Sequence, residues 1–370
     1  LDGSPTRELL RGPAQAWYAN GYVLFLRENT LMAQGFDPGR LELTSEAVPV
    51  ADGVRLVGSI PHAVFSVSQA GHLVYMTGAA TEGSVLRWRD KNGDVTGTTG
   101  ELAVYGDFQV SHDGKHVCIE VFEGGGANAD LWIYDVDTDI RTRFTFDPAN
   151  DFDPVWSRDG SEIIFCSDRT GQFQFYRKTV ASSEPEVMIY ENPDRKNAYD
   201  WSADGRYLLF HANDSTSENS IWMLDLEKSE ARRLTEQGTS CFRPYFSPDE
   251  RWFVFSAFEN GKRIVYARSF PQAGRKWQIS SGEGLTARWP DSGNIFYQTV
   301  SGEVVEAQVT TTATNIILGK ETRLFETRAG NAYNVLEDGS SFIEVYDESS
   351  KLASPLTLVV NWLEDVDGQR

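Results

Sequence analysis

Three aspartates fall close together in the run DPANDFDP, at Asp147, Asp151 and Asp153. Carboxylate oxygens are the ligands that calcium prefers in proteins. A second acidic run, DVDTD from Asp135 to Asp139, starts like a calcium loop but lacks the glycine and later glutamate of a complete EF-hand. We expect that run to be a solvated turn. The prediction is therefore no cofactor and no metal, with Asp147, Asp151 and Asp153 as the calcium candidates.

The five histidines do not form a recognisable catalytic motif. His112 and His116 have H-x-x-x-H spacing, but they flank an expected turn, where this spacing does not place both rings on one helical face. His62 is the histidine that a metal-assisted lyase or hydrolase would need at a channel mouth. The chain contains no G-x-S-x-G elbow and no H-E-x-x-H pair. This segment is therefore predicted not to be an enzyme, with the metal-assisted lyase or hydrolase as an alternative.

A repeat positions these candidate residues. The stretch DFDPVWSRDGSEIIFCSDRTG, residues 151–171, has seven further copies, some of them weaker. The copies recur about every 45 residues and fill nearly the whole chain, which is typical of an array of stacked units. The equivalent turn residues are Gly21, Gly71, Gly114, Gly160, Gly205, Glu250, Gly293 and Gly339.

Each copy is predicted to form four short antiparallel strands. Ser157, Asp159 and Gly160 supply the chemistry of a tight turn between the first two strands. The run EIIFCS that follows is almost entirely apolar, which fits a strand covered on both faces. Eight such units predict an all-β fold, an eight-bladed β-propeller of four-stranded blades that forms a single domain over residues 1–370.

The two ends of the chain are predicted to close this ring. The segment PTRELLRG resembles the fourth strand EARRLTEQG of another copy, whereas the last copy supplies only three strands. We therefore expect Thr6–Leu10 to pair in the same blade as Pro355–Trp362. Closure of this kind removes the open sheet edges that would otherwise promote aggregation.

Polar residues just before the tight turns are predicted to surround the mouth of the channel. Acidic side chains from some copies would face basic side chains from others, an arrangement that suits a zwitterionic or peptide-like ligand. The alternative is that these side chains pair with one another and with water. The predicted ligand-binding residues are Asp107, Asp153, Asp200, Arg243, Arg288 and Tyr333, with Gln15 and Tyr105 completing the ring.

Other conspicuous side chains are expected to have packing roles. Trp156, Trp201 and Trp289 occupy equivalent positions of the repeat, as expected for residues between neighbouring blades. The three cysteines lie in or beside apolar strands and are expected to be small buried hydrophobes.

Charge excludes some partners. The chain has 34 Lys and Arg residues against 54 Asp and Glu residues, a net charge of −20, and no basic block. Phosphate backbones and anionic membranes require clustered cations. We therefore expect no nucleic-acid binding and no direct membrane binding, and a monomeric protein that binds a protein, a peptide or a small ligand.

The pattern W-S-x-D-G at Trp156–Gly160, followed by S-D-x-x-G at Ser167–Gly171, resembles TolB-like (WD-repeat-like) propeller repeats. The stretches GYVLFLRENTLMAQGFDPGRLELTSEAVPVADGV, DLWIYDVDTDIRTRFTFDPANDFDPVWSRDG and PLTLVVNW are similar to the C-terminal propeller region of some bacterial serine/threonine protein kinases. In that family the propeller follows a kinase domain and a membrane-spanning segment. The resemblance therefore implies an extracytoplasmic, periplasmic or cell-surface, sensor or scaffold.

The sequence itself carries no kinase chemistry, because it has no glycine-rich phosphate loop and no H-R-D loop. The predicted function is a non-enzymatic propeller that binds a ligand or protein, as the extracytoplasmic region of a bacterial membrane kinase. A free-standing TolB-like periplasmic scaffold is the second interpretation.

Overall fold

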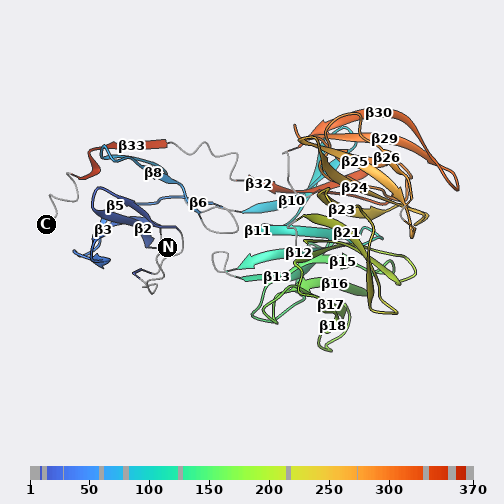
Figure 1. Ribbon diagram of the computed structural model, residues 1–370, viewed down its shortest axis with the longest axis horizontal. Helices are drawn as coiled ribbons and strands as arrows, with labels where there is room; N and C mark the ends of the chain where they lie inside the picture. Colours follow the sequence, from blue (N-terminus) through green and yellow to red (C-terminus); the bar gives the residue numbers. More distant parts are fainter. Residues whose placement is uncertain are drawn as a thin grey trace. The chain divides into compact units, whose positions relative to one another are not determined.

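The computed structural model describes residues 9–10, 15–27, 29–57, 62–77, 83–123, 128–213, 218–272, 274–327, 333–348 and 356–363. The strands in these ranges pair in antiparallel sheets, which confirms the all-β prediction. The chain divides into two compact units (Figure 1). Unit 1 contains Leu1–Ser84, Gly124–Ala127 and Asp347–Arg370, and unit 2 contains Val85–Glu123 and Asn128–Tyr346. Within the described ranges no helix is long and apolar enough to cross a bilayer.

Unit 2 contains four four-stranded sheets in which the strands pair in sequence order. Their strands are β15 (Asp151–Trp156), β16 (Glu162–Ser167), β17 (Gln174–Thr179) and β18 (Val187–Tyr190); β19 (Lys196–Trp201), β20 (Tyr207–Asn213), β21 (Asn219–Asp225) and β22 (Glu230–Arg233); β23 (Cys241–Phe246), β24 (Trp252–Glu259), β25 (Lys262–Ser269) and β26 (Lys276–Gln278); and β27 (Ala287–Arg288), β28 (Ile295–Gln298), β29 (Glu303–Thr311) and β30 (Ile316–Glu326). Each sheet corresponds to one copy of the repeat, as predicted.

A fifth sheet of unit 2 has seven strands, in the order β14-β13-β12-β11-β10-β32-β31. Strands from the beginning and the end of unit 2 therefore share this sheet, and Figure 1 shows β32, β10 and β11 side by side. Its strands are β10 (Ser84–Asp90), β11 (Val95–Val110), β12 (His116–Glu123), β13 (Asn128–Asp135), β14 (Arg141–Arg143), β31 (Tyr333–Val335) and β32 (Ser341–Asp347).

Unit 1 contains three smaller sheets. In the first, β1, β2, β3 and β4 follow one another and β5 also pairs with β3; the second pairs β6 with β7, and the third has the order β33-β9-β8. The strands are β1 (Trp17–Ala19), β2 (Tyr22–Arg27), β3 (Thr30–Asp37), β4 (Glu42–Leu43), β5 (Val48–Ala51), β6 (Leu56–Val57), β7 (His62–Ala63), β8 (Phe65–Val67), β9 (His72–Met76) and β33 (Leu356–Val360).

The strand pairings differ from the predicted ring of eight blades. The copies of the repeat are divided between the two units, so an eight-bladed ring is not confirmed. The described partner of β33 is β9, through pairs such as Leu358 with Val74, whereas β32 pairs with β10. Most of the predicted closing strand Thr6–Leu10 lies outside the described residues. Because all copies share one strand pattern, that pattern does not specify which strand pairs with which.

The tight turn that defines the repeat forms as expected. Gly160 has a φ of 71°, and its N–H donates to the carbonyl of Ser157 at 3.0 Å. The Ser157 hydroxyl donates to Oδ1 of Asp159 at 2.7 Å, and this oxygen also accepts the N–H of Ser161 at 3.0 Å. The hydrogen bond from the Ser161 hydroxyl, at 2.7 Å, and those from the Ser161 N–H and the Ser157 hydroxyl lower the pKa of Asp159 to about 2. The turn therefore depends on Asp159 as a short hydrogen-bond acceptor and on Gly160 as a residue that adopts positive φ.

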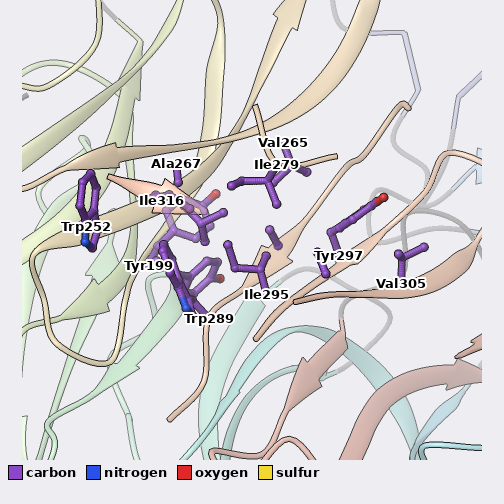
Figure 2. Packing of buried hydrophobic residues seen from close by; sticks show 14 residues of the cluster. Tyr199, Trp252, Val265, Ala267, Ile279, Trp289, Ile295, Tyr297, Val305 and Ile316 are labelled. Atoms are coloured by element: carbon purple, nitrogen blue, oxygen red, sulfur yellow. The ribbon is translucent and has the colours of Figure 1, made fainter. Parts of the chain in front are cut away.

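The repeated tryptophans pack between neighbouring sheets, as predicted. Trp289 lies in a cluster with Trp252, Val265 and Ile279 of the preceding sheet and Ile295 of its own (Figure 2). Trp156 and Trp201 occupy the corresponding clusters of earlier sheets. The three cysteines are buried and form no disulfide, which confirms that they act as small apolar residues.

Candidate functional site

The first strands of unit 2 line two neighbouring hollows, which together we call the channel. Its main cavity has a volume of about 140 Å³ and is lined by residues on or just after β11, β15, β19, β23, β27 and β31. A smaller hollow of about 20 Å³ shares some of the same lining residues. The smaller hollow lies where the chain enters the first strands, the entry end, and the larger lies toward the tight turns, the turn end.

Bulges direct side chains into the entry end. The pairing of the first strand with the second shifts register at an equivalent place in β11, β15, β19 and β23. Asp153 and Arg243 lie at two of these shifts and have φ angles of 53° and 52°, which is a left-handed conformation. Non-glycine residues rarely adopt it, and bulges that re-aim side chains are common beside functional sites.

An ion pair spans the entry end. Arg243 Nη2 of β23 lies 3.2 Å from Asp107 Oδ2 of β11, although β15 and β19 come between these strands in the sequence. The charge of Asp107 outweighs burial and raises the pKa of Arg243 above its usual value. Two of the predicted ligand-binding residues therefore neutralise each other. This agrees with the alternative interpretation, in which the side chains at the channel mouth pair with one another.

A buried carboxyl group supports the same end of the channel. Glu120 of β12 accepts the backbone N–H of Asp153 at 2.8 Å, and Asp153 Oδ2 accepts a hydrogen bond from Asn197 Nδ2 at 2.6 Å. Burial and the nearby charges of Asp153 and Asp107 raise the pKa of Glu120. The neutral form of Glu120 is thereby favoured, because ionising it would place further negative charge in a poorly solvated site.

Asp200 and Tyr333 connect neighbouring strands. The Asp200 carboxylate accepts the backbone N–H groups of Trp201 at 2.9 Å and Phe246 at 2.7 Å, which links β19 to β23. Burial raises the pKa of Asp200 to about 6. The Tyr333 hydroxyl donates to the carbonyl oxygens of Thr286 and Phe296, so it links β31 to the preceding sheet.

Arg288 of β27 lies between the two hollows and lines both of them. Its guanidinium carbon is 3.6 Å from the centre of the Tyr245 ring, a cation–π contact. The Nε and Nη2 atoms lie 3.4 Å from Asn334 Oδ1 and the Tyr333 carbonyl oxygen. Among the described residues, the buried Nη1 atom has no hydrogen-bond partner.

Two residues of the predicted ring lie elsewhere. The Tyr105 hydroxyl is 2.8 Å from the Tyr134 hydroxyl and donates to the Glu101 carbonyl, so its side chain is committed within its own sheet and does not line the channel. Gln15 belongs to unit 1, where its amide exchanges hydrogen bonds with the backbone of Ala63. Tyr105 precedes the bulge that reorients β11, and sequence position alone did not reveal that change of direction.

Charged residues at the turn end were missed by the sequence analysis. His112 Nδ1 is 2.9 Å from Glu337 Oε1 and 3.3 Å from Nη1 of Arg158, which in turn pairs with Asp291. The Asp291 N–H donates to Glu337 at 3.0 Å. These residues occupy or adjoin the variable position of the S-x-D-G turn, so comparing that position among the copies would have found them.

The calcium candidates do not converge. Asp151 is buried and accepts a hydrogen bond from Arg169 at 3.0 Å, while Asp147 lies 3.9 Å from the same guanidinium. Asp153 contacts Asn197 in the channel instead. In the part of the chain that the structure describes, no group of three His, Cys, Asp or Glu residues is arranged to hold a metal ion. The positive charge beside the Asp151 carboxylate is the guanidinium of Arg169.

Comparisons with known proteins agree with this architecture. A family model described as the TolB beta propeller domain matches residues 104–316. The Tol-Pal system protein TolB of Wolinella succinogenes is 25% identical over 182 residues, which cover 48% of this chain and 42% of that protein. Its counterpart from Helicobacter pylori is 26% identical over 167 residues, 44% of this chain and 36% of that protein. The match spans less than half the length of these relatives.

Solved structures show the same fold. TolB from Acinetobacter baumannii has a TM-score of 0.51 and 14% identity, covering 88% of this chain and 78% of that one. A protein assigned as TolB from Agrobacterium tumefaciens has a TM-score of 0.56 and 15% identity, covering 72% of this chain and 98% of that one. Because the family model matches more than half of the residues, the chain belongs to the TolB β-propeller domain family.

Proposed function

We propose that this chain is a non-enzymatic binding propeller of the TolB type, which holds a protein or peptide-like ligand in the channel of unit 2. The observation that carries this proposal is the cavity of about 140 Å³, which is lined by charged residues of both signs on the first strands or in the turns that follow them. Such cavities orient polar ligands by electrostatic complementarity. By their names, the matched relatives belong to a Tol-Pal system, which supports a role in an assembly of proteins.

We also propose that unit 2 is a ring of six blades. Side-chain contacts link each first strand to the next, from the bond between Gln109 of β11 and the Trp156 N–H of β15 to the contact of Arg288 with Asn334 of β31. The bond between His112 and Glu337 then links β31 back to the end of β11. In this arrangement the seven-stranded sheet supplies two blades, one from each half of β11.

Of the two cellular roles predicted from the sequence, we favour the free-standing extracytoplasmic scaffold. Its support is the family together with the Tol-Pal relatives, whereas the kinase ectodomain rests on sequence resemblance alone. The size and cell fraction of the native polypeptide distinguish them. A soluble polypeptide of any length agrees with the scaffold, and a longer membrane-bound polypeptide contradicts it.

The metal-assisted lyase or hydrolase is not favoured. It requires several side-chain ligands around one ion, and the described residues contain no such group. We also propose that the protein is monomeric and binds neither nucleic acid nor membranes. A net charge of −20 without basic clusters favours this.

Blocking the turn end tests the channel proposal. Ala203 lies in one of the tight turns and lines the main cavity, so Ala203→Trp is expected to fill the opening without removing a charged group. Val187→Trp, at a position 59% exposed on the outer strand β18, is the matched control. Both variants and the wild type would be immobilised and exposed to envelope extract from the producing cells, and the retained proteins quantified.

We expect Ala203→Trp to reduce retention of the captured proteins by about tenfold or more, because a central obstruction removes the best-packed part of an interface. Val187→Trp should retain them as the wild type does. Equal retention by Ala203→Trp and the wild type would contradict binding in the channel, and so would a wild type that retains no protein.

A further inference from the structure

The guanidinium of Arg288 is a buried cation that the described part of the protein leaves incompletely paired. The residue is 8% exposed, and within the described ranges no carboxylate lies within 4.0 Å of it. Its polar contacts, to Asn334 and the Tyr333 carbonyl, are long at 3.4 Å, and its Nη1 atom has no partner. Buried charged groups normally have close partners, because an unpaired one loses its hydration without compensation.

The carboxylates that line the same cavity are engaged elsewhere. Asp200 accepts two backbone N–H groups, and Glu337 is paired with His112 and with the Asp291 N–H. Asp291 pairs with Arg158. Glu250, which also lines the cavity, accepts the backbone N–H of Ala203. Each lining acid therefore has a neighbouring donor, whereas the cation at the inner end of the cavity has a donor without a partner among the described residues. An incoming negative group would supply what the site lacks.

The shape of the site favours a carboxylate. Stacking on Tyr245 fixes the plane of the guanidinium, so its unused donor has a defined direction. A planar carboxylate matches the fork geometry of a guanidinium better than a point charge does. The cavity of about 140 Å³ is close to the size, about 150 Å³, that accommodates a benzene-sized molecule in another protein, so a carboxyl group with a short stem fits.

We propose that Arg288 anchors a carboxylate of the ligand at the turn end of the channel. This inference deepens the proposed function and rests on it. The carboxylate is that of a small carboxylic acid or of the C-terminal residue of a peptide, both of which present the same group to the guanidinium. The ligand enters past His112, Arg158 and Glu337, whose charges are already paired with one another or with Asp291.

Titration calorimetry on the full chain tests the anchor with three probes. Propionate represents a small acid, N-acetyl-glycylglycine a peptide C-terminus, and N-acetyl-glycylglycinamide is the matched neutral control. We expect at least one carboxylate to bind about tenfold or more tightly than the amide, because only a carboxylate forms a charge-assisted hydrogen bond with Arg288. Tighter binding of propionate identifies a small-acid site, and tighter binding of N-acetyl-glycylglycine identifies a peptide C-terminus.

Arginine variants assign this preference to one residue. Arg288→Gln is expected to weaken carboxylate binding about tenfold or more, and Arg288→Lys to weaken it less, because lysine keeps the charge but loses the fork. Arg323→Gln is the matched control, since that exposed arginine lies on β30 outside the channel and pairs with Glu303 at 2.9 Å. Near-UV circular dichroism verifies the fold of each variant.

The proposal is overturned if the wild type binds neither carboxylate more tightly than the amide, a comparison that requires no variant. It is also overturned if a folded Arg288→Gln protein binds carboxylates like the wild type, or if Arg323→Gln weakens binding equally. If the wild type captures proteins in the retention experiment and Ala203→Trp captures far fewer, these outcomes remove the carboxylate anchor and leave the binding function intact.

Discussion

At the scale of single residues, the turn end of the channel depends on paired charges. Burial alone would lower the pKa of His112, but the hydrogen bond and charge of Glu337 outweigh it, so that the pKa is raised. Burial likewise opposes ionisation of Glu337, yet the hydrogen bond from His112 keeps its pKa below the usual value. Each group therefore stabilises the charged form of the other, and the native state holds the His112 proton more tightly than the unfolded chain does.

This pairing predicts a pH dependence of stability. Because the native pKa of His112 is raised above its unfolded value of about 6.5, its contribution is fully present below that pH and is lost as pH rises through the native pKa. The difference in melting temperature between the wild type and His112→Gln should therefore shrink as pH rises above about 6.5. The melting temperature of Glu337→Gln should depend less on pH in this range than that of the wild type, because His112 then lacks the partner that raises its pKa. A difference that stays constant or grows with pH would contradict the pairing.

At the scale of elements, the bulges in the first strands shape the entry end. In β11 the register shift lies between Tyr105 and Phe108, and it contains Gly106. A Cβ atom on Gly106 would come within 2.0 Å of Glu120 Oε2 and 3.0 Å of Glu120 Cβ. The second strand thus approaches the bulge so closely that only glycine fits, and this approach lets Glu120 reach the backbone of Asp153.

Substitution of this glycine tests the close approach. Gly106→Ala is expected to lower the free energy of unfolding by about 1–3 kcal/mol, because the methyl group overpacks a buried site. Gly97 lies on the same strand and its Cβ would meet nothing within 4 Å, so Gly97→Ala is the matched control and should have little effect. Urea unfolding measures both. Equal stability of the two variants would mean that the bulge is not tightly packed.

At the scale of the whole molecule, strand exchange between distant parts of the sequence defines unit 2. The sheet that contains β11 joins β10 to β32, so residues near the start of unit 2 lie beside its last strands. Among the described residues, unit 1 contributes to the five sheets of unit 2 only Ser84, the first residue of β10, and Asp347, the last residue of β32. Unit 2 therefore contains the strands that its own sheets require.

A truncation tests this division. A chain of residues 84–346 should fold cooperatively and keep its carboxylate binding, because it retains the paired strands of unit 2 apart from the last residue of β32. A chain of residues 94–346 is the control. It also lacks β10, so it leaves an edge of β32 open and is expected to be unstable or to aggregate. Thermal unfolding and size-exclusion chromatography compare them, and aggregation of the longer chain would instead favour one ring built from all eight copies.

Local chemistry explains what could be predicted. The turn of Ser157, Asp159 and Gly160 and the buried apolar strand after it involve neighbours in sequence, so the repeat and the all-β class were evident before the structure. Counting back from these turns also identified Asp107, Asp153, Asp200 and other residues of the first strands as channel residues. The prediction that Tyr105 and Gln15 line the channel was wrong, because Tyr105 precedes a bulge and Gln15 belongs to unit 1.

The sequence by itself determined the strand–turn–strand repeat, the TolB-like propeller character and the burial of the repeated tryptophans, because these depend on short spacings that each copy carries. Only the tertiary structure decided which strands pair in the sheet that contains β10 and β32. It also decided that the larger of the two channel hollows lies at the turn end. It further decided that Arg243 has an ionic partner, whereas the Nη1 atom of Arg288 has no hydrogen-bond partner within the described ranges. These properties depend on distances between residues far apart in the chain, and eight similar strand patterns do not specify such distances.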